Sequence, residues 1–116
     1  MGIASMIEEI RRGDDFASVG MIVSHNGVVR SVSRDGNPVH GMELTADRNR
    51  LAEIVADMRT RPGIVALQAE IYEGILKTGD DIMCVVVAGD IRDHVFPVLL
   101  ETVTAIKRDV VTEREF

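Results

Sequence analysis

One segment, residues 81–89, limits the possible folds of this chain more than any other. Its sequence, DIMCVVVAG, is apolar over most of its length, and a Thr-Gly-Asp turn signal precedes it. Side chains alternate between the two faces of a strand, so a strand that is apolar on both faces is typical of the centre of a sheet. The sequence therefore predicts a sheet with residues 81–89 as a central strand.

The N-terminal part of the chain predicts one helix and a hairpin. The sequence SMIEEIRR begins with the Ser5-to-Glu8 spacing of a capping box and predicts a short helix. Residues 18–32 predict a strand that Gly20 and Gly27 interrupt, which indicates bulges or a close backbone approach. SRDGNP is a turn sequence, and VHGMEL after it is expected to pair with the preceding strand.

Two helices and one further strand complete the predicted fold. TADRNRLAEIVADMRTRPG predicts a helix with Thr45 or Asp47 as its N-cap and the Pro-Gly pair as its end. IVALQAEIYEG predicts a strand. The last helix is expected to begin near Asp90 or Asp93, to accept Pro97 in or near its first turn, and to carry an apolar stripe at helical spacing.

The order of these elements predicts an α+β sandwich, in which helices pack against a mostly antiparallel sheet. With 116 residues, the chain has the usual size of one domain, so we expect residues 1–116 to form a single domain. Periodicity predicts one core. Its expected members are Val19, Ile22, Leu51, Ile54, Val55, Ile71, Val85, Val87, Phe96, Leu99, Val103 and Ile106.

Charge and hydropathy exclude several classes of function. The formal charge of -6 argues against nucleic-acid binding, which needs a basic face. The apolar runs are far shorter than the roughly 20 residues that span a bilayer. The N-terminal segment has acids and arginines where a signal peptide has an apolar core. We therefore expect no membrane association and a cytoplasmic location.

Metal and cofactor motifs are missing. Cys84 is the only cysteine, and His25, His40 and His94 are scattered without the spacing of metal ligands. Cys84 is interpreted as a buried strand thiol. The chain has no GxGxxG, Walker or GxSxG sequence. We therefore expect neither a metal site nor a bound cofactor.

Basic residues at the ends of predicted elements are the candidates for a binding site. They are Arg30, Arg92, Lys107, Arg108 and Arg114. In an acidic protein, such residues are either solvated ends, where a cation near a helix C-terminus complements the helix dipole, or the lining of a local anion pocket. Their spacing is compatible with both interpretations.

Several segments, in their order, resemble the MoaE family, the large catalytic subunits of molybdopterin synthase. These segments are VGMIVSHNGVVR, RLAEIV, EGILKTGDDIMCVVVAG, RDHVF and the closing IK. The family has a glycine-valine strand that ends in an arginine, a helix with an LAEI-like core, a G-x-L-x-x-G-D-x-I turn into a strand, an HR-then-AF helix start, and an LK followed by WK. The resemblance covers roughly residues 17–115.

The resemblance implies a catalytic pocket built from the basic residues. Arg30 matches the strand-end arginine of the family, Arg92 matches the arginine of HR, and Lys107 matches the lysine of LK, which the family uses in catalysis. Arg114 takes the place of the lysine of WK and is the second catalytic candidate. The guanidinium fork suits carboxylate and phosphate oxygens, whereas an amine can also deprotonate and act as a nucleophile.

Other positions near the implied site depart from the family pattern. The histidine of HR is Ile91 here, and His94 is the candidate to replace it; a solvated histidine at a helix start is the alternative. Arg108 is expected to contribute to anion binding beside Lys107. The tryptophan before the second family lysine is Glu113.

The resemblance also implies a fold, a reaction and an assembly. The fold would be an α/β hammerhead with an additional β subdomain. The reaction would transfer sulfur from the thiocarboxylate of a small ubiquitin-like carrier subunit, which ends in Gly-Gly, to cyclic pyranopterin monophosphate, giving molybdopterin. Two copies would form a homodimer whose sites share residues across the interface.

Two alternatives to this enzyme are open. One is a catalytically degenerate paralogue that keeps the dimer and the carrier groove and acts as a binding or regulatory module. Arg114, Ile91 and the missing C-terminal extension favour it, whereas Lys107 and the two matched arginines favour the enzyme. The other is an unrelated α+β ligand-binding domain, for which the ordered resemblance would be accidental.

Overall fold

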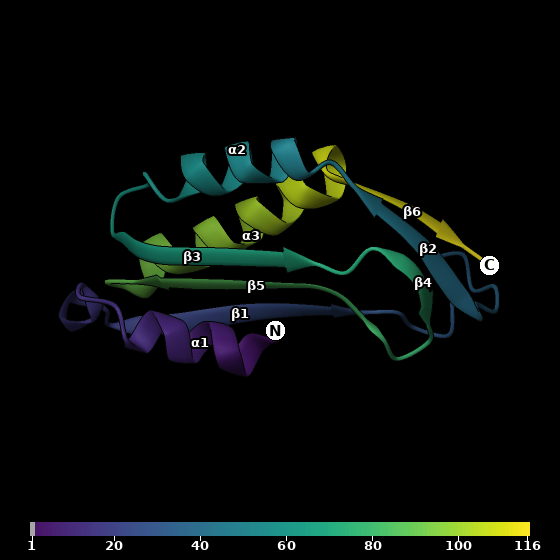
Figure 1. Ribbon diagram of the computed structural model, residues 1–116, viewed down its shortest axis with the longest axis horizontal. Helices are drawn as coiled ribbons and strands as arrows, with labels where there is room; N and C mark the ends of the chain where they lie inside the picture. The colour runs from purple at the N-terminus through teal and green to yellow at the C-terminus, as the bar shows by residue number, and fades with distance from the viewer. Residues whose placement is uncertain (1) are drawn as a thin grey trace.

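The computed structural model describes residues 2–116 as an elongated molecule with extents of 45 × 24 × 23 Å (Figure 1). The elements are α1 (Ile3–Arg11), a short 3-10 helix (Phe16–Ser18), β1 (Met21–Val28), β2 (Gly41–Ala46), α2 (Arg48–Met58), β3 (Ile64–Ile71), β4 (Gly74–Lys77), β5 (Asp81–Gly89), α3 (Arg92–Asp109) and β6 (Val111–Glu115). None of these helices combines the length and the apolar composition that a membrane crossing needs.

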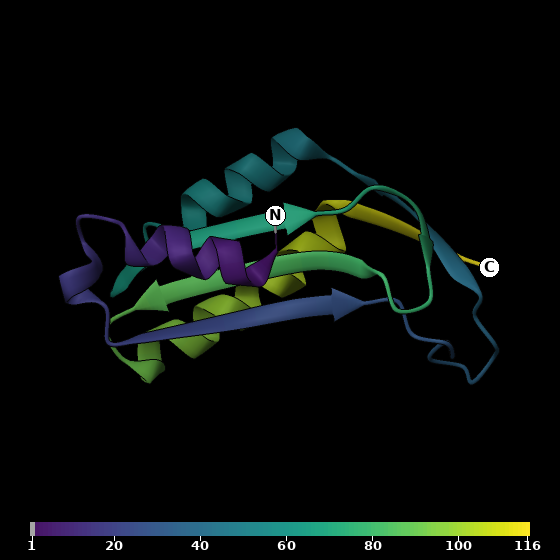
Figure 2. The ribbon, with the colours of Figure 1, turned by 60° about the horizontal axis from the view of Figure 1, so that its bottom comes forward.

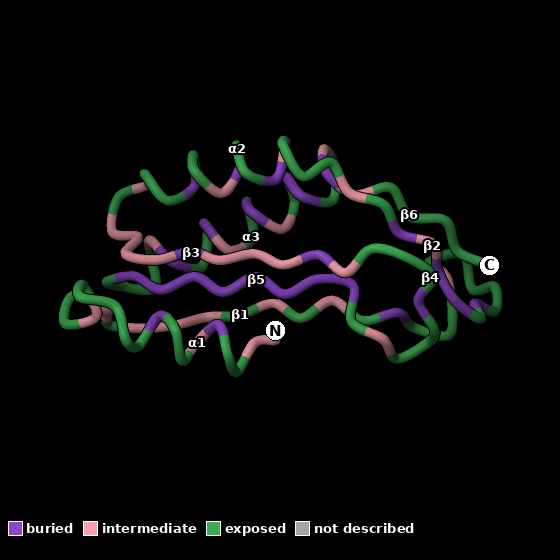
Figure 3. Tube along the Cα trace, in the orientation of Figure 1, coloured by how far each residue is buried: buried purple, intermediate pink, exposed green. Residues whose placement is uncertain are grey.

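The main sheet has the strand order β1-β5-β3, and both pairs are antiparallel. The prediction of a central strand at 81–89 is confirmed. β5 is buried from Ile82 to Gly89, as Figure 3 shows along the middle of the sheet, while its two neighbours are only partly covered. β5 is apolar on both faces because helices cover the sheet on both sides.

Helices α2 and α3 lie on one face of the main sheet, and α1 lies on the other (Figures 1 and 2). The core therefore has two clusters instead of the single predicted one. Val85 and Val87 of β5 belong to the cluster under α2 and α3, whereas Cys84 and Val86 belong to the cluster under α1. Because neighbouring side chains point to opposite faces, the sheet itself separates the two clusters.

The predicted core residues divide between these clusters, with one exception. Leu51, Ile54, Ile71, Val85, Val87 and Ile106 are buried in the larger cluster, and Val55, Leu99 and Val103 pack at its edge. Val19 and Ile22 pack against the smaller cluster. The prediction for Phe96 is wrong, because its side chain is 54% exposed. Val95 takes the inward position, and the next residue along a helix lies about 100° further round its axis.

A second sheet, β4-β2-β6, lies at the far end of the molecule. The predicted hairpin is wrong: β2 pairs with β4 and β6, and the turn after β1 keeps only an isolated bridge between Val32 and Pro38. The hydrophobic pattern alone could not choose the partner of β2. Strands β4 and β6 were not predicted, because both are short and mostly exposed.

Several local predictions are confirmed, and one is wrong. Asp47 caps α2 by accepting a hydrogen bond from the Arg50 N–H. The pairing of β1 shifts register after Gly27, as expected for a bulge. A side chain at Gly20 would overlap the Asp90 carbonyl oxygen, so this glycine marks a close backbone approach. The capping box at Ser5 is wrong, because α1 already begins at residue 3.

Candidate functional site

A pocket of about 480 Å³ lies where the end of β1, the loop that follows it, the last turn of α3 and β6 come together. Its volume is within the usual range for small-molecule sites. The two sheets and the last helix each contribute to its walls. The residues that line it are Val28, Val29, Arg30, Ser33, Arg34, Asp35, Met42, Ile82, Lys107, Glu113 and Glu115.

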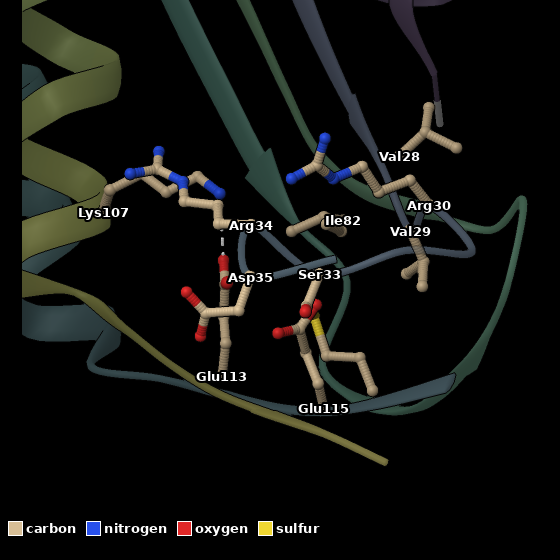
Figure 4. Close-up of a pocket in the computed structure, with 11 residues that line it drawn as sticks. Val28, Val29, Arg30, Ser33, Arg34, Asp35, Ile82, Lys107, Glu113 and Glu115 are labelled. Carbon is tan, nitrogen blue, oxygen red and sulfur yellow. Dashed lines mark hydrogen bonds and ion pairs between the residues drawn. The ribbon is translucent and has the colours of Figure 1, made fainter. Parts of the chain in front are cut away.

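The charged groups of this pocket are divided between its two sides. Figure 4 shows the nitrogen atoms of Arg30, Arg34 and Lys107 on one side and the carboxylates on the other. The carboxylates belong to Asp35, Glu113 and Glu115. The lining therefore has three basic and three acidic side chains and no formal net charge. The basic side concentrates positive charge in a protein whose formal charge is -6.

Lys107 is held at the pocket by the last strand of the chain. It lies in the last turn of α3, and the chain then turns at Val110 into β6. Lys107 Nζ is 3.0 Å from Glu113 Oε1, and the two side chains are 45% and 28% exposed. The amine is therefore accessible to solvent, and within residues 2–116 its ionic partner is Glu113.

Arg30 and Arg34 are placed at the pocket by the loop between β1 and β2. Arg30 follows the end of β1, and Arg34 lies in the turn that contains Gly36, whose φ of 85° suits glycine. Neither guanidinium forms a hydrogen bond or an ion pair with another residue in the described range 2–116. Both groups can therefore bind an incoming carboxylate or phosphate.

Arg114 does not line this pocket. It follows Glu113 on β6, so its side chain points to the opposite face of the strand. Its guanidinium is 3.2 Å from the carboxylate of Glu43, its register partner on β2. The structure thus brings the matched residues Arg30 and Lys107 together but separates Arg114 from them within one chain.

The other predicted anion-binding residues also lie outside the pocket. Arg92 is the first residue of α3, about 22 Å from Lys107 along a helix that rises ~1.5 Å per residue. His94 Nδ1 is 2.8 Å from Asp90 Oδ1, and the hydrogen bond from His94 is the main reason that the pKa of Asp90 lies below its usual value. Arg108 is bound to the carboxylate of Asp109 and lines a different hollow, between α2 and α3.

His25 is a neighbour of Lys107 that the sequence analysis did not select. Residues 21 and 23 of β1 pack in the cluster under α3, so the alternation places His25 on the same face. Burial, and secondly the charge of Lys107, lowers the pKa of His25. Its Nε2 atom is buried and has no hydrogen-bond partner within residues 2–116.

The sequence analysis also missed Arg34, Asp35, Glu113 and Glu115. Arg34 and Asp35 lie in a segment whose sequence indicates only a turn. The two glutamates lie on a short strand that can be recognised only by its pairing with β2. A signal was available for His25, which is the polar residue in an alternating apolar row on β1.

Comparisons with known proteins define the class of this fold. The fold matches that of molybdopterin synthase from Staphylococcus aureus, with a TM-score of 0.80, 19% identity, and coverage of 99% of this chain and 85% of that one. It also matches molybdopterin cofactor biosynthesis protein E from Burkholderia multivorans ATCC 17616, with a TM-score of 0.79, 20% identity and coverage of 100% and 81%.

A third similar structure is the complex of subunits 1 and 2 of molybdopterin-converting factor from Helicobacter pylori 26695, with a TM-score of 0.75, 12% identity and coverage of 99% and 78%. These likenesses confirm the predicted α+β fold. A comparison with curated protein sequences finds no match.

The family of this chain follows from its sequence. Residues 3–109 match the model of the family described as MoaE protein. The chain therefore belongs to the MoaE family, which assigns it to molybdenum cofactor biosynthesis.

Proposed function

We propose that this protein is the catalytic subunit of a molybdopterin synthase, which transfers sulfur from a thiocarboxylated carrier to cyclic pyranopterin monophosphate. The observation that carries the proposal is the meeting of Arg30 and Lys107 at one pocket. These residues are 77 positions apart in the sequence, and both match positions that the family uses. Their meeting supports a reaction site more strongly than either residue does alone.

The chemistry of the pocket suits an anionic substrate and a carboxyl-terminal tail. The free guanidinium groups of Arg30 and Arg34 would hold phosphate or carboxyl oxygens in paired hydrogen bonds. Lys107 Nζ, partly exposed beside them, would then be the reactive amine, acting as a nucleophile or a proton carrier. Val28, Val29 and Ile82 add an apolar wall that excludes water from one side.

The proposed assembly has two kinds of partner. One is a small ubiquitin-like sulfur carrier whose Gly-Gly tail enters the pocket; the similar structure from Helicobacter pylori is described as a complex of two subunits. The other is a second copy of this chain. A homodimer would allow Arg92, His94 or Arg114 of one copy to complete the pocket of the other, which they do not reach in their own chain.

Reconstitution tests this proposal. The purified protein is mixed with a thiocarboxylated carrier and cyclic pyranopterin monophosphate, and dithiolene formation is measured by conversion to a fluorescent pterin derivative. The proposal predicts formation of molybdopterin that depends on both partners. Carrier binding, measured by calorimetry, is the accompanying control, because it shows that the mixture contains a competent complex.

One observation favours the second candidate, a binding or regulatory module. Lys107 is paired with a carboxylate of its own chain, and Arg114 points to the other face of β6. Such a module would bind the carrier or a pterin phosphate with no sulfur transfer. If calorimetry shows binding of the carrier but the reconstitution gives no product, the binding or regulatory module becomes the better interpretation of this protein.

A further inference from the structure

The pocket beside Lys107 contains free carboxylates as well as free guanidinium groups. Of its three acidic side chains, Glu113 is bound to Lys107. The carboxylates of Asp35 and Glu115 form no hydrogen bond or ion pair with another residue in the range 2–116. Hydrogen-bond acceptors are therefore available to a ligand on the acidic side of the pocket.

The register of β6 on β2 directs Glu115 into the pocket. Glu113 and Glu115 are two residues apart and share one face of β6, whereas Arg114 between them is bound to Glu43 on the other face. Met42 is the register partner of Glu115 on β2 and also lines the pocket. Glu115 therefore belongs to the pocket wall that the second sheet forms.

The carboxylate of Glu115 and the guanidinium groups of Arg30 and Arg34 lie on opposite sides of the pocket (Figure 4). The arginines attract an anionic group, and Glu115 repels it. A carboxylate is an acceptor only, so it binds groups that donate N–H or O–H hydrogen bonds. A ligand that satisfies both sides therefore has an anionic group at one end and N–H donors at the other.

Most of the remaining lining is apolar and consists of Val28, Val29, Met42 and Ile82. The last three are at most 5% exposed, so packing holds them in place. Such a wall can cover the face of a flat ring, and a methionine sulfur makes favourable contacts with aromatic rings. The pocket therefore suits a planar heterocycle that carries an anionic substituent.

The pyrimidinone ring of a pterin has donors that match one carboxylate. A ring N–H lies beside an exocyclic amino group, so two N–H bonds point in nearly the same direction. A carboxylate can accept both together, as it does from the fork of a guanidinium group. The opposite end of a pterin phosphate carries the anion.

Resting on the proposed function, in which the substrate is a pterin phosphate, we propose that Glu115 is a specificity-determining residue that binds the 2-amino-4-oxopyrimidine edge of this substrate. One hydrogen bond comes from the ring N–H and one from the amino group. Arg30 and Arg34 hold the phosphate at the other end. Binding at both ends fixes the direction in which the substrate lies in the pocket.

Asp35 is the other free carboxylate, and its surroundings suit this role less well. It follows Arg34 in a tight turn, in which the Gly36 N–H donates to the Ser33 carbonyl oxygen at 3.0 Å. The charge of Asp35 therefore opposes the anion that Arg34 binds. Because Asp35→Asn removes a carboxylate from the same pocket, it is the matched control for Glu115→Gln.

The experiment compares two fluorescent ligands, pterin-6-carboxylate and lumazine-6-carboxylate, by fluorescence titration at slightly acidic pH, where both ring systems are uncharged. They share the ring system and the anionic group, but the lumazine has a carbonyl oxygen where the pterin has its amino group. A carboxylate repels that oxygen. We expect the wild type to bind the pterin about tenfold more tightly or better, the discrimination that paired hydrogen bonds to a base edge typically give.

Glu115→Gln is expected to remove this preference, because the glutamine amide has one acceptor and one donor, which match the ring N–H and the carbonyl oxygen of the lumazine. Asp35→Asn should keep the preference. A wild-type preference in Glu115→Gln, or the same loss in Asp35→Asn, overturns the proposal. So does equal binding of the two ligands by the wild type, or binding of neither.

Inorganic phosphate reports on the other side of the pocket. Glu115→Gln should bind it at least as tightly as the wild type, because Arg30 and Arg34 are unchanged and a negative charge is removed. Weaker phosphate binding would mean that Glu115 supports the pocket instead of the ligand, and would also overturn the proposal. Sulfur transfer can fail while the preference for the pterin persists, so the proposed function is tested separately.

Discussion

Lys107 Nζ lies 3.0 Å from Glu113 Oε1, so the last helix and the last strand of the chain are joined across the turn at Val110. This ion pair occupies the amine that the family resemblance identifies as catalytic. Because the pocket also contains Asp35 and Glu115, an incoming anion must compete with carboxylates of the protein. The strength of anion binding therefore depends on Glu113.

Glu113→Gln is expected to strengthen anion binding, because it removes a negative charge and frees Lys107. Inorganic phosphate is the probe, and calorimetry at low salt should show an affinity about threefold to tenfold higher than in the wild type, or ~0.7–1.4 kcal/mol. Glu43→Gln is the matched control, since Glu43 pairs with Arg114 on the other face of β6. Equal affinities in all three proteins would contradict the claim that Glu113 competes with the anion for Lys107.

The stability of the fold is expected to depend on His25 at acidic pH. Burial lowers the pKa of His25 below its usual value, so the unfolded state binds more protons between the folded pKa and about 6.5. Stability therefore falls as pH decreases through this window and is unaffected by His25 above it. Urea unfolding of His25→Phe should show a shallower loss between pH 7 and pH 5 than the wild type. A parallel loss would contradict the burial argument.

Gly20→Ala is expected to destabilise the protein, because the new methyl group would overlap the Asp90 carbonyl oxygen, a backbone atom that cannot easily move. Overpacking of this kind typically costs about 1–3 kcal/mol. Urea unfolding measures the change. Gly27→Ala is the control, since its methyl group makes only ordinary contacts of 3.4 Å or more; similar losses in both variants would show that the close approach is absent.

Ile106→Ala and Phe96→Ala test the two faces of α3. Ile106 is fully buried and Phe96 is 54% exposed. Truncation of a buried isoleucine typically costs about 2–5 kcal/mol of unfolding free energy, whereas exposed positions usually change it by less than ~0.5 kcal/mol. Thermal unfolding at low protein concentration should give this order. The reverse order would mean that the helix is rotated about its axis.

Much of the main sheet could be predicted from the sequence, because its signals are local. The apolar run of β5, the Asp47 cap of α2 and the bulge at Gly27 each follow from a few neighbouring residues. Sheet β4-β2-β6 could not, since its pairing depends on contacts between distant segments. The pattern of β2 is compatible with a hairpin to β1 as well as with the pairing observed.

The candidate site was predictable only where the family resemblance placed residues. Arg30 and Lys107 follow from matched motifs, but no local pattern predicts that Glu113 faces Lys107 while Arg114 faces Glu43. Those orientations follow from the register of β6 on β2, and a shift of one residue would exchange them. The position of His25 near the site could be recognised only in the structure, because an isolated histidine in a strand is usually only a packed side chain.

The central claim is that Lys107 is the reactive group of a sulfur-transfer site. The most direct measurement is single-turnover formation of molybdopterin from thiocarboxylated carrier and cyclic pyranopterin monophosphate by the wild type, Lys107→Ala and Lys77→Ala. Because alanine is a good helix former and the Lys107 side chain is 45% exposed, the variant should fold normally and bind the carrier. We predict product with the wild type and Lys77→Ala and none with Lys107→Ala; product formation by Lys107→Ala at the wild-type rate would contradict the claim.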